Sequence, residues 1–71
     1  MKVYLQNDVT LAYLLRPGAW TSDPDRAMVF KDSGCAIQFC LEHQLPDMRI
    51  VLHFPKFRQD VHMPVKLPRL V

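Results

Sequence analysis

The chain has 71 residues, a formal net charge of +2, 49% hydrophobic residues and 23% charged residues. This length allows one domain with a small core, and the composition excludes a disordered chain. Two cysteines exclude a disulfide framework. Because Gly18 and Gly34 are the only glycines, the chain also lacks the G-x-G-x-x-G and Walker A patterns of nucleotide-binding proteins.

Neither a secretory signal nor a membrane span is expected. The N-terminus has one basic residue, Lys2, and polar residues begin as early as Gln6. The apolar segment of a signal peptide is therefore missing. No apolar run approaches the roughly 20 residues that a spanning helix needs. The sequence therefore predicts a cytoplasmic protein that makes no membrane contact.

The first part of the chain favours a β-hairpin. Residues 3–6 predict a first strand, and the short side chains of Asn7 and Asp8 favour a turn. Residues 11–15 predict a second strand, because three of its large apolar side chains alternate. The predicted face of this strand consists of Leu11, Tyr13 and Leu15.

A turn and a short helical segment follow the hairpin. Proline and glycine in residues 16–18 end the second strand. Ser22 or Asp23 can cap a helical turn that begins at Pro24, because proline suits the first helical position. Residues 28–30 predict a short third strand.

The central segment predicts one amphipathic helix. Asp32 and Ser33 are both good N-cap residues, since their side-chain oxygens can accept hydrogen bonds from free N–H groups of the first turn. The helix should end near Gln44, because Pro46 disfavours the helical conformation of the residue before it. One stripe at helical spacing contains Ala36, Phe39, Cys40 and His43.

The last part predicts two more strands. Residues 49–54 alternate in polarity and predict a fourth strand, and residues 61–66 predict a fifth. Pro64 places the fifth strand at a sheet edge, because proline cannot donate to a strand ladder. The expected fold is therefore α+β, a small two-layer domain of residues 1–66 in the order β-β-β-α-β-β. One helix packs on a mainly antiparallel sheet of four to five strands. The expected core contains Trp20, Phe30, Phe39, Ile50 and Leu52.

Catalytic and metal-binding constellations are not found in the sequence. Cys35 and Cys40 would point about 140° apart on one helix, so they cannot pair with each other. His43, His53 and His62 lack the close spacing that places two zinc ligands on one element. An enzyme that uses Cys35 as a helix-activated thiolate is an alternative of lower rank. We expect no enzyme activity, no cofactor, no metal and no small-molecule substrate.

The C-terminal third offers a partner-binding surface. Residues 48–71 carry five basic side chains and one acidic side chain, whereas residues 1–47 carry four basic and six acidic ones. This basic third suits either a solvated strand face or a surface for an acidic protein or a phosphate backbone. Residues 67–71 form an apolar tail, which is either a disordered chain end or a docking segment. The candidate partner-binding residues are Lys56, Phe57, Arg58, Met63, Leu67, Leu70 and Val71.

Two resemblances cover the first part of the chain. The stretch W-T-S-D-P-D-R-A-M-V-F-K-D-S-G-C-A-I-Q-F-C, with Tyr4 and Leu5 before it, resembles small uncharacterised bacterial and phage proteins over residues 3–45. The matching positions are Tyr4, Leu5, Trp20, Thr21, Asp23, Ala27, Phe30, Ala36 and Phe39. This resemblance implies a fold and a prokaryotic origin.

A looser likeness is to a small accessory subunit of respiratory complex I, which is similar at Trp20, Asp23-Pro24, Val29-Phe30 and the helix around Phe39. The downstream motifs of that subunit are missing here, so electron transport is not implied. Both likenesses suggest an accessory domain. We therefore expect a small non-catalytic protein-interaction module that binds a protein partner or a second copy of itself. The alternative is a nucleic-acid-binding protein that uses the basic third, with stacking by an exposed aromatic side chain.

Overall fold

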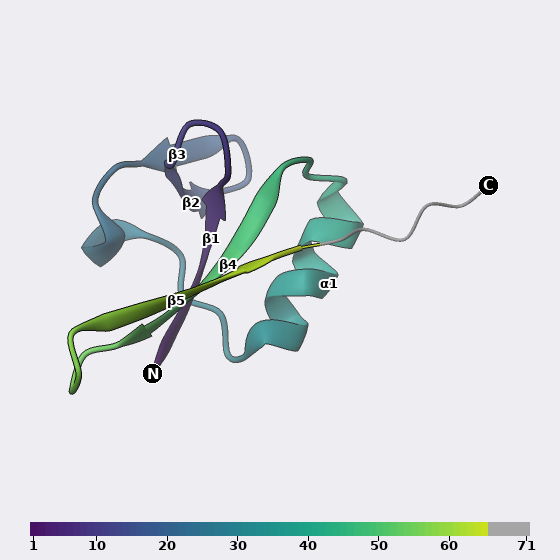
Figure 1. Ribbon diagram of the computed structural model, residues 1–71. Helices are drawn as coiled ribbons and strands as arrows, with labels where there is room; N and C mark the ends of the chain where they lie inside the picture. The colour runs from purple at the N-terminus through teal and green to yellow at the C-terminus, as the bar shows by residue number, and fades with distance from the viewer. Residues whose placement is uncertain (66–71) are drawn as a thin grey trace.

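The fold is α+β, with one helix packed on one face of a five-stranded antiparallel sheet (Figure 1). The structure is a computed structural model that describes residues 1–65. The spatial order of the strands is β3-β2-β1-β4-β5. The elements are β1 (Lys2–Asn7), β2 (Tyr13–Arg16), β3 (Ala19–Thr21), the 3-10 turn η1 (Pro24–Arg26), α1 (Ser33–His43), β4 (Met48–Phe54) and β5 (Gln59–Pro64).

The first strand of the chain, β1, lies at the centre of the sheet. It pairs with β4 along its whole length, from Lys2 opposite His53 to Asn7 opposite Met48. Side chains alternate between the two faces of a strand, so β1 contributes to both faces. Val3 and Leu5 lie on the face that α1 covers, and Tyr4 lies on the opposite face.

Helix α1 begins and ends as the sequence predicts. Of the two candidate caps, Asp32 is the N-cap, and its Oδ1 accepts a 2.8 Å hydrogen bond from the Cys35 N–H. Gln44 ends the helix in the left-handed conformation with φ 50°. Ala36 and Cys40 are fully buried against the sheet. Among residues 1–65, no helix has the length and apolar character needed to cross a bilayer.

A second, smaller cluster covers part of the other face. Tyr4, Val51 and Ala27 are buried there, and Tyr13 packs against them. Ala27 directly follows η1, whose predicted start at Pro24 is confirmed and whose cap is Asp23. Ala27 therefore covers part of the sheet on the side away from the helix, whereas Phe30, further along the same segment, packs in the core on the helix side.

The prediction of a third strand at residues 28–30 was wrong. The third strand is β3, because Pro17 and Gly18 form a tight hairpin turn that folds Ala19 back onto Arg16. Gly18 has φ 80°, which glycine adopts without steric cost and which the third residue of a type II turn requires. Residues 28–30 instead fill the space between β1 and β2, where the Phe30 N–H donates to the Val3 carbonyl at 2.8 Å.

The expected core was right in part. Phe30 and Ile50 are buried, and Phe39 and Leu52 are half-buried against them. The prediction for Trp20 was wrong, because β3 is an edge strand and leaves this side chain 41% exposed.

The prediction that Leu11, Tyr13 and Leu15 share one face of the second strand was wrong at Leu11, which lies before the strand. Leu14, which lies between Tyr13 and Leu15, is fully buried toward the helix. Tyr13 lies on the opposite face, against Tyr4. Leu11 lies outside β2 in a turn, with φ 63°. A strand of large apolar residues on both faces gives no alternation from which the inward side could be read.

The predicted edge position of β5 is confirmed, with a shift in its bounds. The strand begins at Gln59 rather than residue 61, because the turn before it is shorter than predicted. Among residues 1–65, only β4 pairs with β5.

Candidate interaction surface

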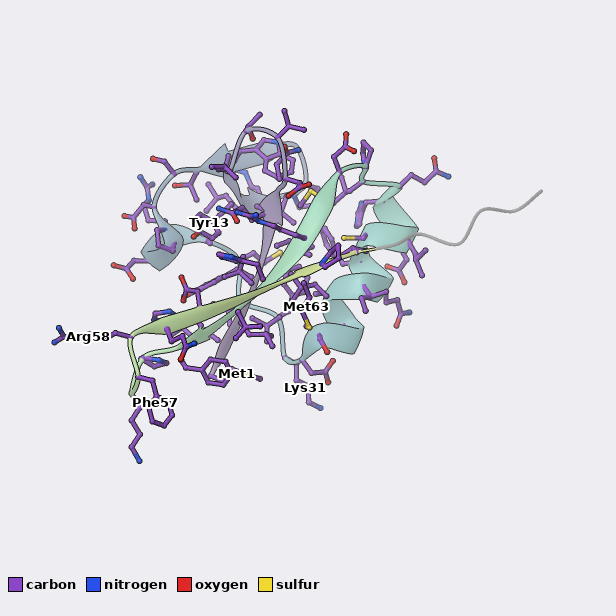
Figure 2. All side chains as sticks on the ribbon, in the orientation of Figure 1. Met1, Tyr13, Lys31, Phe57, Arg58 and Met63 are labelled. Atoms are coloured by element: carbon purple, nitrogen blue, oxygen red, sulfur yellow. The ribbon has the colours of Figure 1, made fainter. Side chains whose placement is uncertain are left out.

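The hairpin of β4 and β5 ends in an exposed turn that carries three of the predicted site residues. Residues 55–58 form this turn, in which the Phe57 N–H donates to the Phe54 carbonyl at 3.1 Å. Phe57 is 70% exposed, and Lys56 and Arg58 are exposed beside it. Figure 2 shows Phe57 and Arg58 at the end of the hairpin, pointing away from the body of the protein. We call Lys56, Phe57 and Arg58 the hairpin tip.

Met63 does not belong to this tip. It pairs with Ile50 near the other end of β5, and its half-buried side chain packs against the core under α1. The remaining candidates, Leu67, Leu70 and Val71, lie outside the described residues. The structure therefore brings together three of the seven candidates and places a fourth in a different environment.

The outer edge of β5 carries backbone groups that point away from the sheet. The Val65 N–H donates to the Met48 carbonyl at 3.1 Å, so residues 65 and 48 form a hydrogen-bonded pair. Such pairs alternate along an antiparallel ladder. The backbone groups of Val61 and Met63 therefore face β4, whereas those of Asp60, His62 and Pro64 face outward.

This alternation explains how the strand tolerates Pro64. Proline lacks an N–H group, and at position 64 that group would point away from β4. No ladder hydrogen bond is lost, which agrees with the confinement of proline to sheet edges. On the outer edge of β5, the available donors are the N–H groups of Asp60 and His62.

Charged and aromatic side chains lie next to this edge, on the face away from α1. His53 Nδ1 lies 2.6 Å from Asp60 Oδ1, directly across the β4–β5 ladder. The His53 ring lies 6.3 Å from the ring of Tyr4. Burial raises the pKa of the Tyr4 hydroxyl, and the nearby carboxylates of Asp25 and Asp60 raise it further. Tyr4 is therefore neutral at physiological pH.

A polar network lies further along the same face. Gln6 is buried, and its Oε1 accepts a 2.7 Å hydrogen bond from Arg49 Nε. Its Nε2 donates to the Leu11 carbonyl at 2.9 Å. Arg49 also lies 3.5 Å from the carboxylate of Asp8. Both polar atoms of the Gln6 side chain are thus hydrogen-bonded, Nε2 to the turn between β1 and β2 and Oε1 to Arg49 on β4.

The two cysteines lie in different environments. Cys35 is exposed near the start of α1, and Cys40 is buried beneath the same helix. Burial raises the pKa of the Cys40 thiol, which keeps it protonated at neutral pH. His53 lies on the face of the sheet opposite α1, so the sheet separates this imidazole from Cys35.

Residues 1–65 show no group of three His, Cys, Asp or Glu side chains that could hold one metal ion. No pocket opens among these residues either. The features that distinguish the surface are the hairpin tip and the outer edge of β5.

The predicted fifth strand begins at residue 61, so the contact between Asp60 and His53 is not predicted from the sequence. The signal that could have found the pair is the length of the hairpin turn. A four-residue turn at residues 55–58 sets Phe54 opposite Gln59 and therefore His53 opposite Asp60. The outward position of His62 follows from the same register.

Comparison of the chain with protein-family models, with curated proteins and with solved structures found no match. The surface itself therefore carries the functional argument.

Proposed function

We propose that this protein is a non-catalytic interaction module, which binds a protein partner by accepting a strand on the outer edge of β5. The observation that carries this proposal is the outward orientation of the backbone groups of Asp60 and His62 on an exposed edge strand. An extended segment that pairs with such an edge gains main-chain hydrogen bonds, and its side chains add specificity.

The composition of the edge limits how far a partner strand can pair. Pro64 offers a carbonyl but no N–H, so a ladder built from residue 60 loses a donor after residue 62. Such a short pairing site favours a specific, reversible association over open-ended aggregation. Because both Cys35 and Cys40 are free thiols, we also propose that the protein works in a reducing compartment such as the cytoplasm.

The test is partner capture by the intact protein and by two variants at one exposed position. His62→Pro removes an outward N–H without removing a hydrogen bond to β4, because Pro64 already occupies the equivalent outward position. His62→Lys keeps the N–H and serves as the matched control. We expect the proline variant to lose bound proteins that the lysine variant retains, with both variants showing wild-type circular dichroism. Equal capture by both variants would refute binding at this edge.

The hairpin tip supports a second candidate function, nucleic-acid binding. Two basic side chains flank an exposed aromatic ring there, and this combination can hold phosphates and stack a base. We expect binding of labelled single strands that weakens steeply as salt rises, because phosphate contacts release counterions. Replacing Lys56 and Arg58 by glutamate should abolish it. The absence of any mobility shift in low salt would end this candidate function.

A further inference from the structure

We infer that the strand which the β5 edge accepts is β5 of a second copy of this chain. This inference rests on the proposed function and names its partner. The two strands run antiparallel about a two-fold axis at Val61, so that Asp60 of each copy lies opposite His62 of the other. The evidence is the backbone pattern of the edge and the charges of its outward residues.

The backbone pattern restricts the possible registers. Within residues 59–65, the part of this edge that the structure describes, only Asp60, His62 and Pro64 turn their backbone groups outward. The intermolecular hydrogen-bonded pairs therefore join these residues. Asp60 opposite His62 uses the N–H and C=O groups of both residues in both copies. This register leaves Pro64 at the end of the new ladder, where its missing N–H has the least effect.

Charge selects this register over its two symmetric neighbours. A shift in one direction sets Asp60 opposite Asp60 of the second copy, which places two carboxylates face to face. A shift in the other direction sets His62 opposite His62 and Asp60 opposite Pro64, which gives no opposite-charge pair. Only the central register pairs a carboxylate with an imidazole at both ends.

The carboxylate of Asp60 can contact His62 of the second copy in addition to His53. His53 contacts Oδ1, and the side chain remains 39% exposed. A carboxylate has two oxygens and several acceptor sites, so Oδ2 can accept from His62 of the second copy. His62 is itself exposed.

An apolar contact completes the interface on the other face of the sheet. Val61 is 39% exposed and lies on the side of the sheet that faces α1, beside Leu52. At the two-fold axis it meets Val61 of the second copy in a non-hydrogen-bonded pair, where opposing side chains are closest. The two copies then share one continuous sheet with both helices on the same face, which removes the β5 edge from solvent.

The experiment measures the oligomeric state of the purified protein by sedimentation velocity over a concentration series at low salt. Four proteins are compared, namely the wild type, His62→Asp, His62→Lys and His62→Pro. The first variant sets two carboxylates opposite each other at both ends of the interface, and the second places an ammonium group opposite Asp60. We expect the dissociation constant of the dimer to rise roughly 10-fold or more in the aspartate variant and to change little in the lysine variant.

Amide hydrogen exchange locates the contact. The Asp60 and His62 amides should exchange rapidly in the dilute protein and become protected as its concentration rises. The Val61 and Met63 amides face β4 and should be protected at every concentration.

The outcomes separate the inference from the function on which it rests. A wild-type protein that stays monomeric at all concentrations overturns the inference, while loss of partner capture in His62→Pro would still support strand addition by another protein. A dimer that neither the aspartate nor the proline variant weakens overturns the inference, because its interface then lies elsewhere. Equal partner capture by the proline and lysine variants would separately refute the proposed function. A dimer that His62→Asp and His62→Pro weaken and His62→Lys does not weaken supports both the inference and the proposed function.

Discussion

The buried amide of Gln6 offers the sharpest test of what holds the sheet together. Replacing Gln6 by methionine keeps the length and shape of the side chain but removes both of its hydrogen bonds. A neutral hydrogen bond contributes about 1 kcal/mol and one to a charged group about 1.5–3 kcal/mol. Arg49 is partly exposed and can turn to water or to Asp8, so the second loss falls at the lower end. We expect a total loss of about 2.5 kcal/mol in the free energy of unfolding.

Urea unfolding followed by circular dichroism measures this loss. The midpoint should fall while the slope of the transition stays constant, because the area exposed on unfolding is unchanged. The matched control is Gln38→Met, which removes a hydrogen bond to Glu42 on the exposed side of α1. That change should stay within about 0.5 kcal/mol. If the variants at Gln6 and Gln38 lose equal stability, the two hydrogen bonds of Gln6 contribute no more than an exposed one, and the expected difference is refuted.

Three further predictions follow from the backbone, the helix cap and the core. Leu11→Gly should stabilise the protein by about 0.5 kcal/mol in thermal unfolding, because it relieves a φ of 63°, whereas Val9→Gly in the same loop should destabilise it. The hydrogen bond from the Cys35 N–H holds the pKa of the Asp32 carboxyl below its usual value. The ionised Asp32 cap therefore stabilises the folded protein above about pH 4, and this stabilisation is lost as the pH falls through the folded-state pKa. Asp32→Asn should therefore lose this acid dependence, and parallel acid-unfolding curves would contradict it. Leu14→Ala should lower the free energy of unfolding in urea by about 2–5 kcal/mol, because Leu14 is fully buried, and Leu15→Ala should lower it clearly less. The reverse order would show that the opposite face of β2 is the buried one.

The helix and the C-terminal hairpin could be predicted because local chemistry specifies them. Asp32 caps the helix and Pro46 prevents its continuation, and both signals act within one turn of the chain. The alternation of residues 49–54 and the proline at position 64 likewise indicate a buried strand beside an edge strand.

The region between Leu11 and Phe30 could not be predicted in the same way. Large apolar residues occupy both faces of β2, since Leu14 packs under α1 and Tyr13 packs on Tyr4. Which side becomes the larger core depends on where the helix docks, and that is a tertiary property. The sequence Pro17-Gly18 is compatible both with the end of a strand and with a tight hairpin turn. The pairing of Ala19 with Arg16 shows that it forms the hairpin turn.

The sequence predicts the residues of the hairpin tip and the edge position of the fifth strand, but not which residues of that strand turn their backbone groups outward. Lys56, Phe57 and Arg58 are adjacent in sequence, so composition alone points to them. The role proposed for Asp60 and His62 depends on which backbone groups face β4, which requires the register of the hairpin.

The central position of β1 also determines when this chain can fold during synthesis. β1 is synthesised before β4, with which it pairs along its full length. The β1–β4 ladder therefore cannot close at Lys2 until His53 has been synthesised. The hairpin of β2 and β3 can form earlier, but it pairs with β1 at only one register position, Gln6 with Tyr13. The sheet is therefore completed only after most of the chain has left the ribosome, and until then Val3 and Leu5 need protection from other nascent chains.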